Sequence, residues 1–97
     1  MMYVKIHKNQ DREILAVCDE DILGKTFEEG DLQIKISEVF YKGEKKSEKD
    51  TLDLINHFDN ISLVGVKTIK LALDNELIEE SSIIIINGIP HVQIYNL

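Results

Sequence analysis

The sequence predicts an α+β fold, with a mostly antiparallel sheet of about five strands and two helices packed on it. Stretches with the two-residue alternation of a strand are grouped towards both ends of the chain, at 2–8, 13–18, 32–41 and 83–95. Stretches with helical spacing of apolar residues lie between them, at 47–59 and 65–77. The expected order of elements is therefore β-β-β-α-α-β-β.

The first two strands are expected to form a hairpin. Residues 2–8 alternate between apolar and polar side chains, which is typical of a half-buried strand. Residues 13–18 are apolar on both faces, as in a strand that is covered on both sides. Only a short polar turn separates them. After the second strand, Asp21 is expected to cap a single helical turn that Gly24 ends.

The middle of the chain is expected to hold the third strand and the first helix. The alternation over 32–41 changes phase near Glu38, which predicts a β-bulge. The segment 42–49 is rich in lysine and glutamate and is expected to be a solvated loop. Ser47 followed by Asp50 resembles a capping box, and a helix of about three turns with a broad apolar stripe follows it.

The last third of the chain is expected to hold the second helix and the final strands. Residues 61–64 form a short apolar run, either a strand or the approach to a helix that begins at Gly65. Residues 83–86 are four isoleucines and are expected to form a buried strand. An Asn87-Gly88 turn signal follows, and then a last strand over 92–94 that can extend to Asn96.

Size and charge limit the classes of function. The 97 residues are expected to form a single domain over 1–97. The net charge of −7 disfavours non-specific nucleic-acid binding, which requires clustered basic residues. A local basic patch at 42–49 stays possible in principle, and it would bind RNA in a strongly salt-dependent manner. Because the chain has one cysteine, no signal peptide and no long apolar run, we expect a cytoplasmic protein without a membrane partner.

The segment that follows the isoleucines is the first candidate site. Pro90 fixes its own backbone, and Gly88 can adopt a positive φ, so that His91 is held at a defined place. A neutral imidazole there can act as an acid, a base or a metal ligand near neutral pH. The alternative is a half-exposed strand histidine bonded to a carbonyl group. We include Gln93, which follows in the same segment, in the candidate surface.

The end of the second strand is the other candidate site. Cys18 can act as a nucleophile only if a cation lowers its pKa, and the carboxylates that follow it act in the opposite sense. Its phase in the strand favours a small buried side chain. The full candidate set at this place is Cys18, Asp19, Glu20, Asp21, Gly24 and Lys25.

Three known motifs are approached here without being completed. A calcium loop requires other residues at Leu23 and Gly30, which leaves only a looser divalent-ion site from Asp19, Glu20, Asp21 and Asp31. A P-loop requires glycine where Asp19 stands. The three histidines and Cys18 lack the short spacing of a zinc site. We therefore expect no metal and no cofactor.

Two blocks of the sequence resemble a known family. They are Val17 to Phe27, which contains Cys-Asp-Glu and Leu-Gly-Lys, and Gly88 to Gln93, which contains Gly-Ile-Pro-His. Together with Asn60 to Gly65, they are similar to the signature segments of a small archaeal family described as domain of unknown function 424. The resemblance covers nearly the whole chain and implies an archaeal cytoplasm. It implies no catalytic role for any residue.

These observations favour a binding or adaptor module that is not an enzyme. Its surface would be formed by the Cys18–Lys25 turn and the Gly88–Gln93 turn, and its partner would be a protein or a ribonucleoprotein. The alternative is a small enzyme or metal-binding protein that uses His91 with Cys18, or with Asp19 and Asp21. Joint catalysis requires these side chains to lie within about 8 Å of one another.

Overall fold

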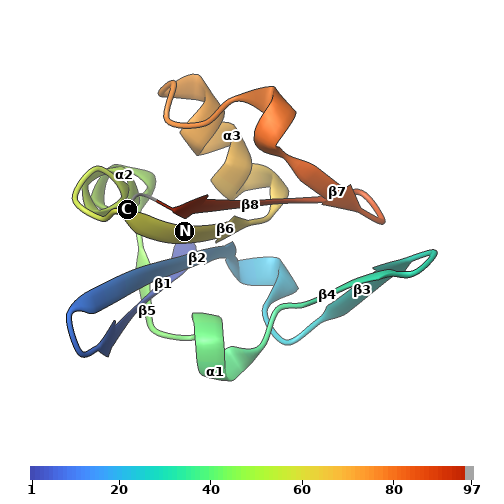
Figure 1. Cartoon of the computed structure of the whole chain (residues 1–97), viewed down its shortest axis with the longest axis horizontal. Coiled ribbons are helices and arrows are strands. Elements are labelled where there is room, and N and C mark those ends of the chain that lie inside the picture. Colours follow the sequence, from blue (N-terminus) through green and yellow to red (C-terminus); the bar gives the residue numbers. More distant parts are fainter. Residues whose placement is uncertain (96–97) are drawn as a thin grey trace.

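The computed structural model describes residues 1–95, which form a six-stranded sheet, a separate two-stranded sheet and three α-helices (Figure 1). The strand order in the large sheet is β5-β1-β2-β6-β8-β7. Its strands are β1 (Met2–Asn9), β2 (Arg12–Asp19), β5 (Glu44–Lys46), β6 (Asn60–Val64), β7 (Ile84–Ile86) and β8 (Ile89–Tyr95). The small sheet is the hairpin of β3 (Thr26–Glu29) and β4 (Leu32–Lys35). The helices are α1 (Glu38–Tyr41), α2 (Glu48–Ile55) and α3 (Val66–Asp74), and single 3-10 turns cover Glu20–Ile22 and Glu80–Ser82.

The α+β class is confirmed. We expected a mostly antiparallel sheet of about five strands, and the large sheet is mixed and has six. β2 and β6 run parallel, with Leu15 opposite Ile61 and Cys18 opposite Val64. The other neighbouring pairs in this sheet are antiparallel. The predicted order also omitted β3 and β5, and it left β6 open between a strand and the approach to a helix. The parallel pair was not expected, because the alternation of side chains reports a strand but neither its partner nor its direction.

The large sheet has a helical face and an opposite face, each with its own apolar cluster (Figure 1). Side chains of α2 and α3 pack on the first face, against Leu15, Leu63 and Val92. The opposite face is covered by α1, the Glu20–Ile22 turn and the β3–β4 hairpin. Burial on both faces explains why residues 15–19 are fully covered, as the apolar run at 13–18 predicted.

The segment around Glu38 corrects two predictions. We expected one bulged strand over 32–41, and the chain instead ends β4 at Lys35 and forms the short helix α1. The Ser37 hydroxyl accepts a hydrogen bond from the backbone N–H of Phe40 (3.1 Å), which begins that helix. The Tyr41 hydroxyl then contacts the Ser62 hydroxyl at 2.9 Å and fixes α1 to the sheet. The change of phase near Glu38 therefore marked a helix and no bulge.

The two predicted helices are confirmed, and so is the first strand pair. The Ser47 hydroxyl accepts from the N–H of Asp50 at the start of α2. Gly65 is the residue before α3. The expected loop at 42–49 is corrected in part, because it contains β5, an edge strand of the sheet. The extension of the last strand to Asn96 lies outside the described residues.

The isoleucine run at 83–86 shows a clear difference between the expected and the observed burial. We expected a buried strand at 83–86, but β7 is an edge of the sheet. Ile86 is buried, whereas Ile84 and Ile85 are 54% and 59% exposed. An edge strand has one neighbour only, so an apolar sequence does not guarantee its cover.

Candidate functional site

The two predicted segments meet at Gly65, which lies between β6 and α3. On one side, the carboxylate of Asp19 lies directly against Gly65. On the other, the Gly65 N–H donates to the carbonyl oxygen of Pro90 at 2.9 Å. The Cys18–Lys25 and Gly88–Gln93 segments are therefore linked through the start of α3.

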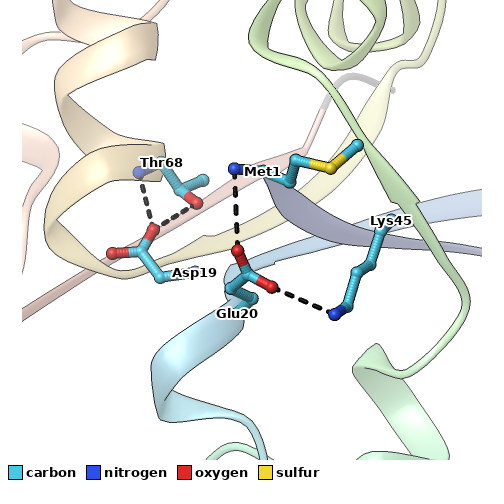
Figure 2. Close-up of polar contacts among 5 residues, drawn as sticks. All are labelled: Met1, Asp19, Glu20, Lys45 and Thr68. Carbon is cyan, nitrogen blue, oxygen red and sulfur yellow. Dashed lines mark hydrogen bonds and ion pairs between the residues drawn. The ribbon is translucent and has the colours of Figure 1, made fainter.

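Asp19 is a buried carboxylate that caps α3. Its Oδ1 accepts from the N–H and the hydroxyl of Thr68 at 2.8 and 2.7 Å (Figure 2). Its Oδ2 accepts from the N–H of Lys67 at 2.9 Å. These bonds satisfy free N–H groups at the helix N-terminus, where negative charge is also favoured. Because both oxygens are engaged, the structure accounts for Asp19 as a structural cap and disfavours it as a metal ligand.

Gly65 is required by this cap. Its φ is +114°, a conformation that side chains rarely allow. A Cβ atom at this position would lie 2.4 Å from the Cγ of Asp19. The close approach of Asp19 to the helix start therefore depends on glycine.

Cys18 and His91 lie in one row across the sheet, but one strand apart. Both are paired with Val64, Cys18 from β2 and His91 from β8. Neighbouring strands are about 4.8 Å apart, so the two Cα atoms are separated by about 10 Å with the buried Val64 between them. This arrangement does not support direct joint catalysis by the two side chains.

The electrostatics of the two groups agree with the geometry. Burial, followed by the charges of Asp19 and Asp21, raises the pKa of the Cys18 thiol from 9.0 to about 12. The thiol is therefore protonated near neutral pH and is a poor nucleophile. Burial lowers the pKa of His91, which keeps its ring neutral.

The remaining polar residues of the first segment point elsewhere. The exposed Glu20 carboxylate forms an ion pair with Lys45 on β5 at 3.2 Å, opposite in direction to Asp19 (Figure 2). The hydrogen bond from Lys45 lowers the pKa of Glu20. Asp21 is exposed inside the 3-10 turn that it was expected to cap, because the turn already begins at Glu20, after Asp19. Gly24, with φ +84°, and Lys25 bond through their backbones to Ile36 at the base of the β3–β4 hairpin.

The Gly88 turn meets the tip of the β3–β4 hairpin. Asn87 and Gly88 have φ values of 49° and 80°, which confirms the predicted two-residue turn. The backbone N–H of Asn87 donates to Glu29 Oε1 at 2.6 Å. Both hairpins project from the same end of the molecule (Figure 1). The neighbour of this turn is therefore Glu29, where we expected the Cys18–Lys25 turn.

In the part of the chain that the structure describes, neither a metal-binding cluster nor the cavity at the far end of the sheet involves the two predicted segments, Cys18–Lys25 and Gly88–Gln93. Within residues 1–95, no group of three or more His, Cys, Asp or Glu side chains is arranged to hold a metal ion. A cavity of about 420 Å³ lies at the far end of the sheet. It is lined by Asp11, Arg12, Glu13, His57, Phe58, Asp59, Asn60 and Tyr95. None of these residues belongs to the two predicted segments.

Comparison with known proteins gives one family. The sequence profile described as "Protein of unknown function (DUF424)" matches residues 7–97. The chain belongs to the DUF424 family. Its fold is similar to the crystal structure of an uncharacterized conserved protein from Methanopyrus kandleri, with a TM-score of 0.76 and 27% identity. That alignment covers 99% of this chain and 94% of the other. No curated protein matches significantly.

The family membership confirms the resemblance carried by the two sequence blocks, and the organism of the structural neighbour is in keeping with an archaeal family. In this DUF424 protein, no helix in residues 1–95 is long and apolar enough to cross a membrane.

Sequence reasoning missed the surface that this DUF424 protein exposes beside the Gly88 turn. It consists of the edge strand β7, where Ile84 and Ile85 are exposed on opposite faces, and the neighbouring β3–β4 hairpin, which exposes Leu32 and bonds to the turn through Glu29. The isoleucine run was visible in the sequence, but it was assigned to the core. The sequence gives no sign that Glu29 contacts this turn, because the two lie 58 positions apart. A signal was available, namely an apolar run with no charged residue to protect a possible edge.

Proposed function

We propose that this DUF424 protein is a binding module that engages a partner protein through its hairpin surface. We define the hairpin surface as Leu32, Ile84 and Ile85 together with Glu28, Glu29 and Asp31. It adjoins the Gly88–Gln93 segment and the hairpin that follows Lys25, so it is a relocated form of the surface expected from the sequence.

The observation that carries this proposal is the exposure of large apolar side chains on adjoining elements. Leu32, Ile84 and Ile85 are each more than half exposed, at 53%, 54% and 59%. β3 and β4 both lie close to β7. Other exposed apolar residues, such as Ile6, Val39 and Val66, lie singly on β1, α1 and α3. Grouped apolar exposure is typical of an interaction site, whereas isolated exposure is ordinary.

A protein is favoured over a nucleic acid by the charges around the surface. The hairpin tip carries three carboxylates and no lysine or arginine between 27 and 34. These carboxylates repel phosphate groups, and nucleic-acid binding depends on neutralising phosphates.

Affinity purification with quantitative mass spectrometry tests the proposal. Wild-type protein, Ile84→Ser and Val39→Ser serve as baits in a lysate of the source organism. Val39 is 79% exposed on α1 and provides a matched apolar-to-polar control. We expect specific partners to be retained by Val39→Ser. Ile84→Ser should weaken their binding about thirtyfold or more, because loss of a hot-spot side chain costs about 2 kcal/mol or more. Circular dichroism verifies that both variants are folded. Equal recovery with all three baits would exclude the hairpin surface.

A further inference from the structure

We propose that the partner supplies an extended, basic segment that adds to the free edge of β7 as a further strand of the sheet. This inference rests on the proposed function and specifies the chemistry of its partner. Addition of a strand uses main-chain hydrogen bonds for affinity and alternating side chains for specificity.

The backbone of Ile85 is directed away from the sheet. In the two-residue hairpin, Ile86 pairs with Ile89 and Ile85 pairs with Pro90. Hydrogen-bonded and non-hydrogen-bonded pairs alternate in an antiparallel ladder. Pro90 has no N–H, and its carbonyl oxygen accepts from Gly65 on the other side of β8. Ile85 is therefore in a non-hydrogen-bonded pair, and both its N–H and its C=O face the open edge.

The two edges of the sheet differ in protection. β5 presents Glu44, Lys45 and Lys46, and charged side chains of this kind prevent pairing with foreign strands. β7 consists of isoleucine alone and has no charged residue. No charged side chain or proline of β7 blocks an incoming strand. The β7 edge is therefore open to pairing, whereas the β5 edge is protected.

The charge around β7 selects a basic partner. Glu79 and Glu80 lie shortly before the strand, and Glu29 reaches the turn at its other end through the N–H of Asn87. Residues 76–95 contain no lysine or arginine. An extended segment on this edge would therefore pass between carboxylates at both ends of β7. Lysine or arginine side chains satisfy them, and acidic ones are repelled.

The same charges disfavour a second copy of this chain as the occupant. Pairing of two β7 edges would bring two sets of these carboxylates together, on molecules that each carry a net charge of −7. Like charges placed opposite each other across an interface oppose association.

A synthetic peptide of alternating valine and lysine is the probe, titrated into the isotope-labelled full chain and followed by NMR. We expect shifts at β7 and slower hydrogen exchange at the Ile85 amide, because this N–H becomes bonded to the peptide. A matched peptide of alternating valine and glutamate is expected to bind at least about tenfold more weakly at low salt. Equal affinity of the two peptides would overturn the charge argument.

Ile85→Pro tests the main-chain contact, with Ile85→Val as its control. Proline removes the outward N–H without removing a bond to β8, whereas valine retains the N–H and most of the side chain. We expect Ile85→Pro to weaken peptide binding about tenfold or more and Ile85→Val to change it less than about threefold. If Ile85→Pro does not fold, exchange of the Ile85 amide in the wild-type chain decides the question alone.

The outcomes separate the two proposals. If Ile84→Ser loses its natural partners while Ile85→Pro binds normally, the hairpin surface stands and strand addition is wrong. If neither change affects partner binding, the proposed function fails. Dimerisation through β7 in sedimentation experiments, with no peptide binding, would identify a second copy as the occupant and overturn the basic partner.

Discussion

The cap formed by Asp19 and the glycine at position 65 depend on each other. The carboxylate needs a close approach to the start of α3 to reach the N–H groups of Lys67 and Thr68. Gly65 allows this approach because it carries no side chain and because its φ of +114° is accessible to glycine. Capping interactions of this kind contribute about 0.5–2 kcal/mol to stability.

Gly65→Ala is expected to lower the free energy of unfolding by more than about 3 kcal/mol, through backbone strain and the clash with Asp19. Urea denaturation measures the loss. Gly30→Ala is the control, because Gly30 also has a positive φ, at 62°, but no atom lies within 4 Å of the added Cβ. That variant should lose only about 1 kcal/mol. Similar losses for the two variants would contradict the role given to Asp19.

Cys18 makes stability depend on alkaline pH. Its folded pKa of about 12 lies above the usual 9.0, so its contribution to stability is complete below pH 9.0 and is lost as the pH rises towards 12. Over that range the unfolded state loses the proton first, and stability falls by up to about 1.4 kcal/mol per pH unit. Urea denaturation of wild type and Cys18→Ala at a series of alkaline pH values measures the difference in slope. Burial, the largest cause of the raised pKa of Tyr41, acts in both proteins and cancels from the comparison, and only the smaller contribution of the Cys18 charge is lost in Cys18→Ala. Parallel slopes would exclude a buried, protonated thiol.

At the scale of elements, the sequence predicted turns and helix caps well, but it did not predict which distant segments contact each other. The Asn87-Gly88 turn and the caps at Ser47 and Gly65 are encoded within a few residues, so their positions were correct. The bond from Lys67 to Asp19 joins residues 48 positions apart, and no local pattern reports it. For the same reason, the parallel pairing of β2 with β6 was not predictable from alternation.

The candidate site shows the same division. Cys18 followed its strand phase into the core, as the alternative interpretation predicted. The edge position of β7 depends on which strands pair with β8, so the exposure of Ile84 and Ile85 could not be read from the isoleucine run. Apolar residues indicate that a segment tends to be buried, but the topology decides which elements, if any, cover it.

The β3–β4 hairpin is attached to the rest of the molecule in part through Glu29. Glu29→Ala removes the acceptor for the Asn87 N–H, so hydrogen exchange at Asn87 should become at least about tenfold faster. Global stability should change by less than about 1 kcal/mol, since the bond is exposed. Glu28→Ala, which alters the adjacent residue of β3, is the control and should leave exchange at Asn87 unchanged. Equal acceleration by both variants would point to general loosening of the hairpin. NMR-detected exchange gives both measurements.

At the scale of the whole molecule, charge is distributed unevenly between the two edges of the sheet. The lysines of 42–49 lie at the β5 edge, and the carboxylates of the hairpin surface lie near the β7 edge. Part of the basic charge is already compensated, because Lys45 pairs with Glu20 and Lys46 pairs with Glu44, each at 3.2 Å. The basic segment therefore presents less free positive charge than its sequence suggests.

This compensation leads to a prediction about RNA. Fluorescence anisotropy with a labelled single-stranded RNA should give no saturable binding at physiological salt, because strong binding requires the release of several counterions by free basic groups. Replacing Lys42 and Lys49 with glutamine should leave the signal unchanged. Glu20→Gln is the sensitising variant, since it frees Lys45 and reduces the net negative charge, and weak binding at low salt is expected from it alone.

If the wild type bound RNA with an affinity that fell steeply with salt and depended on Lys42 and Lys49, the β5 edge would be an RNA-binding surface. The partner would then be a ribonucleoprotein contacted through both edges, and β7 alone would not account for recognition.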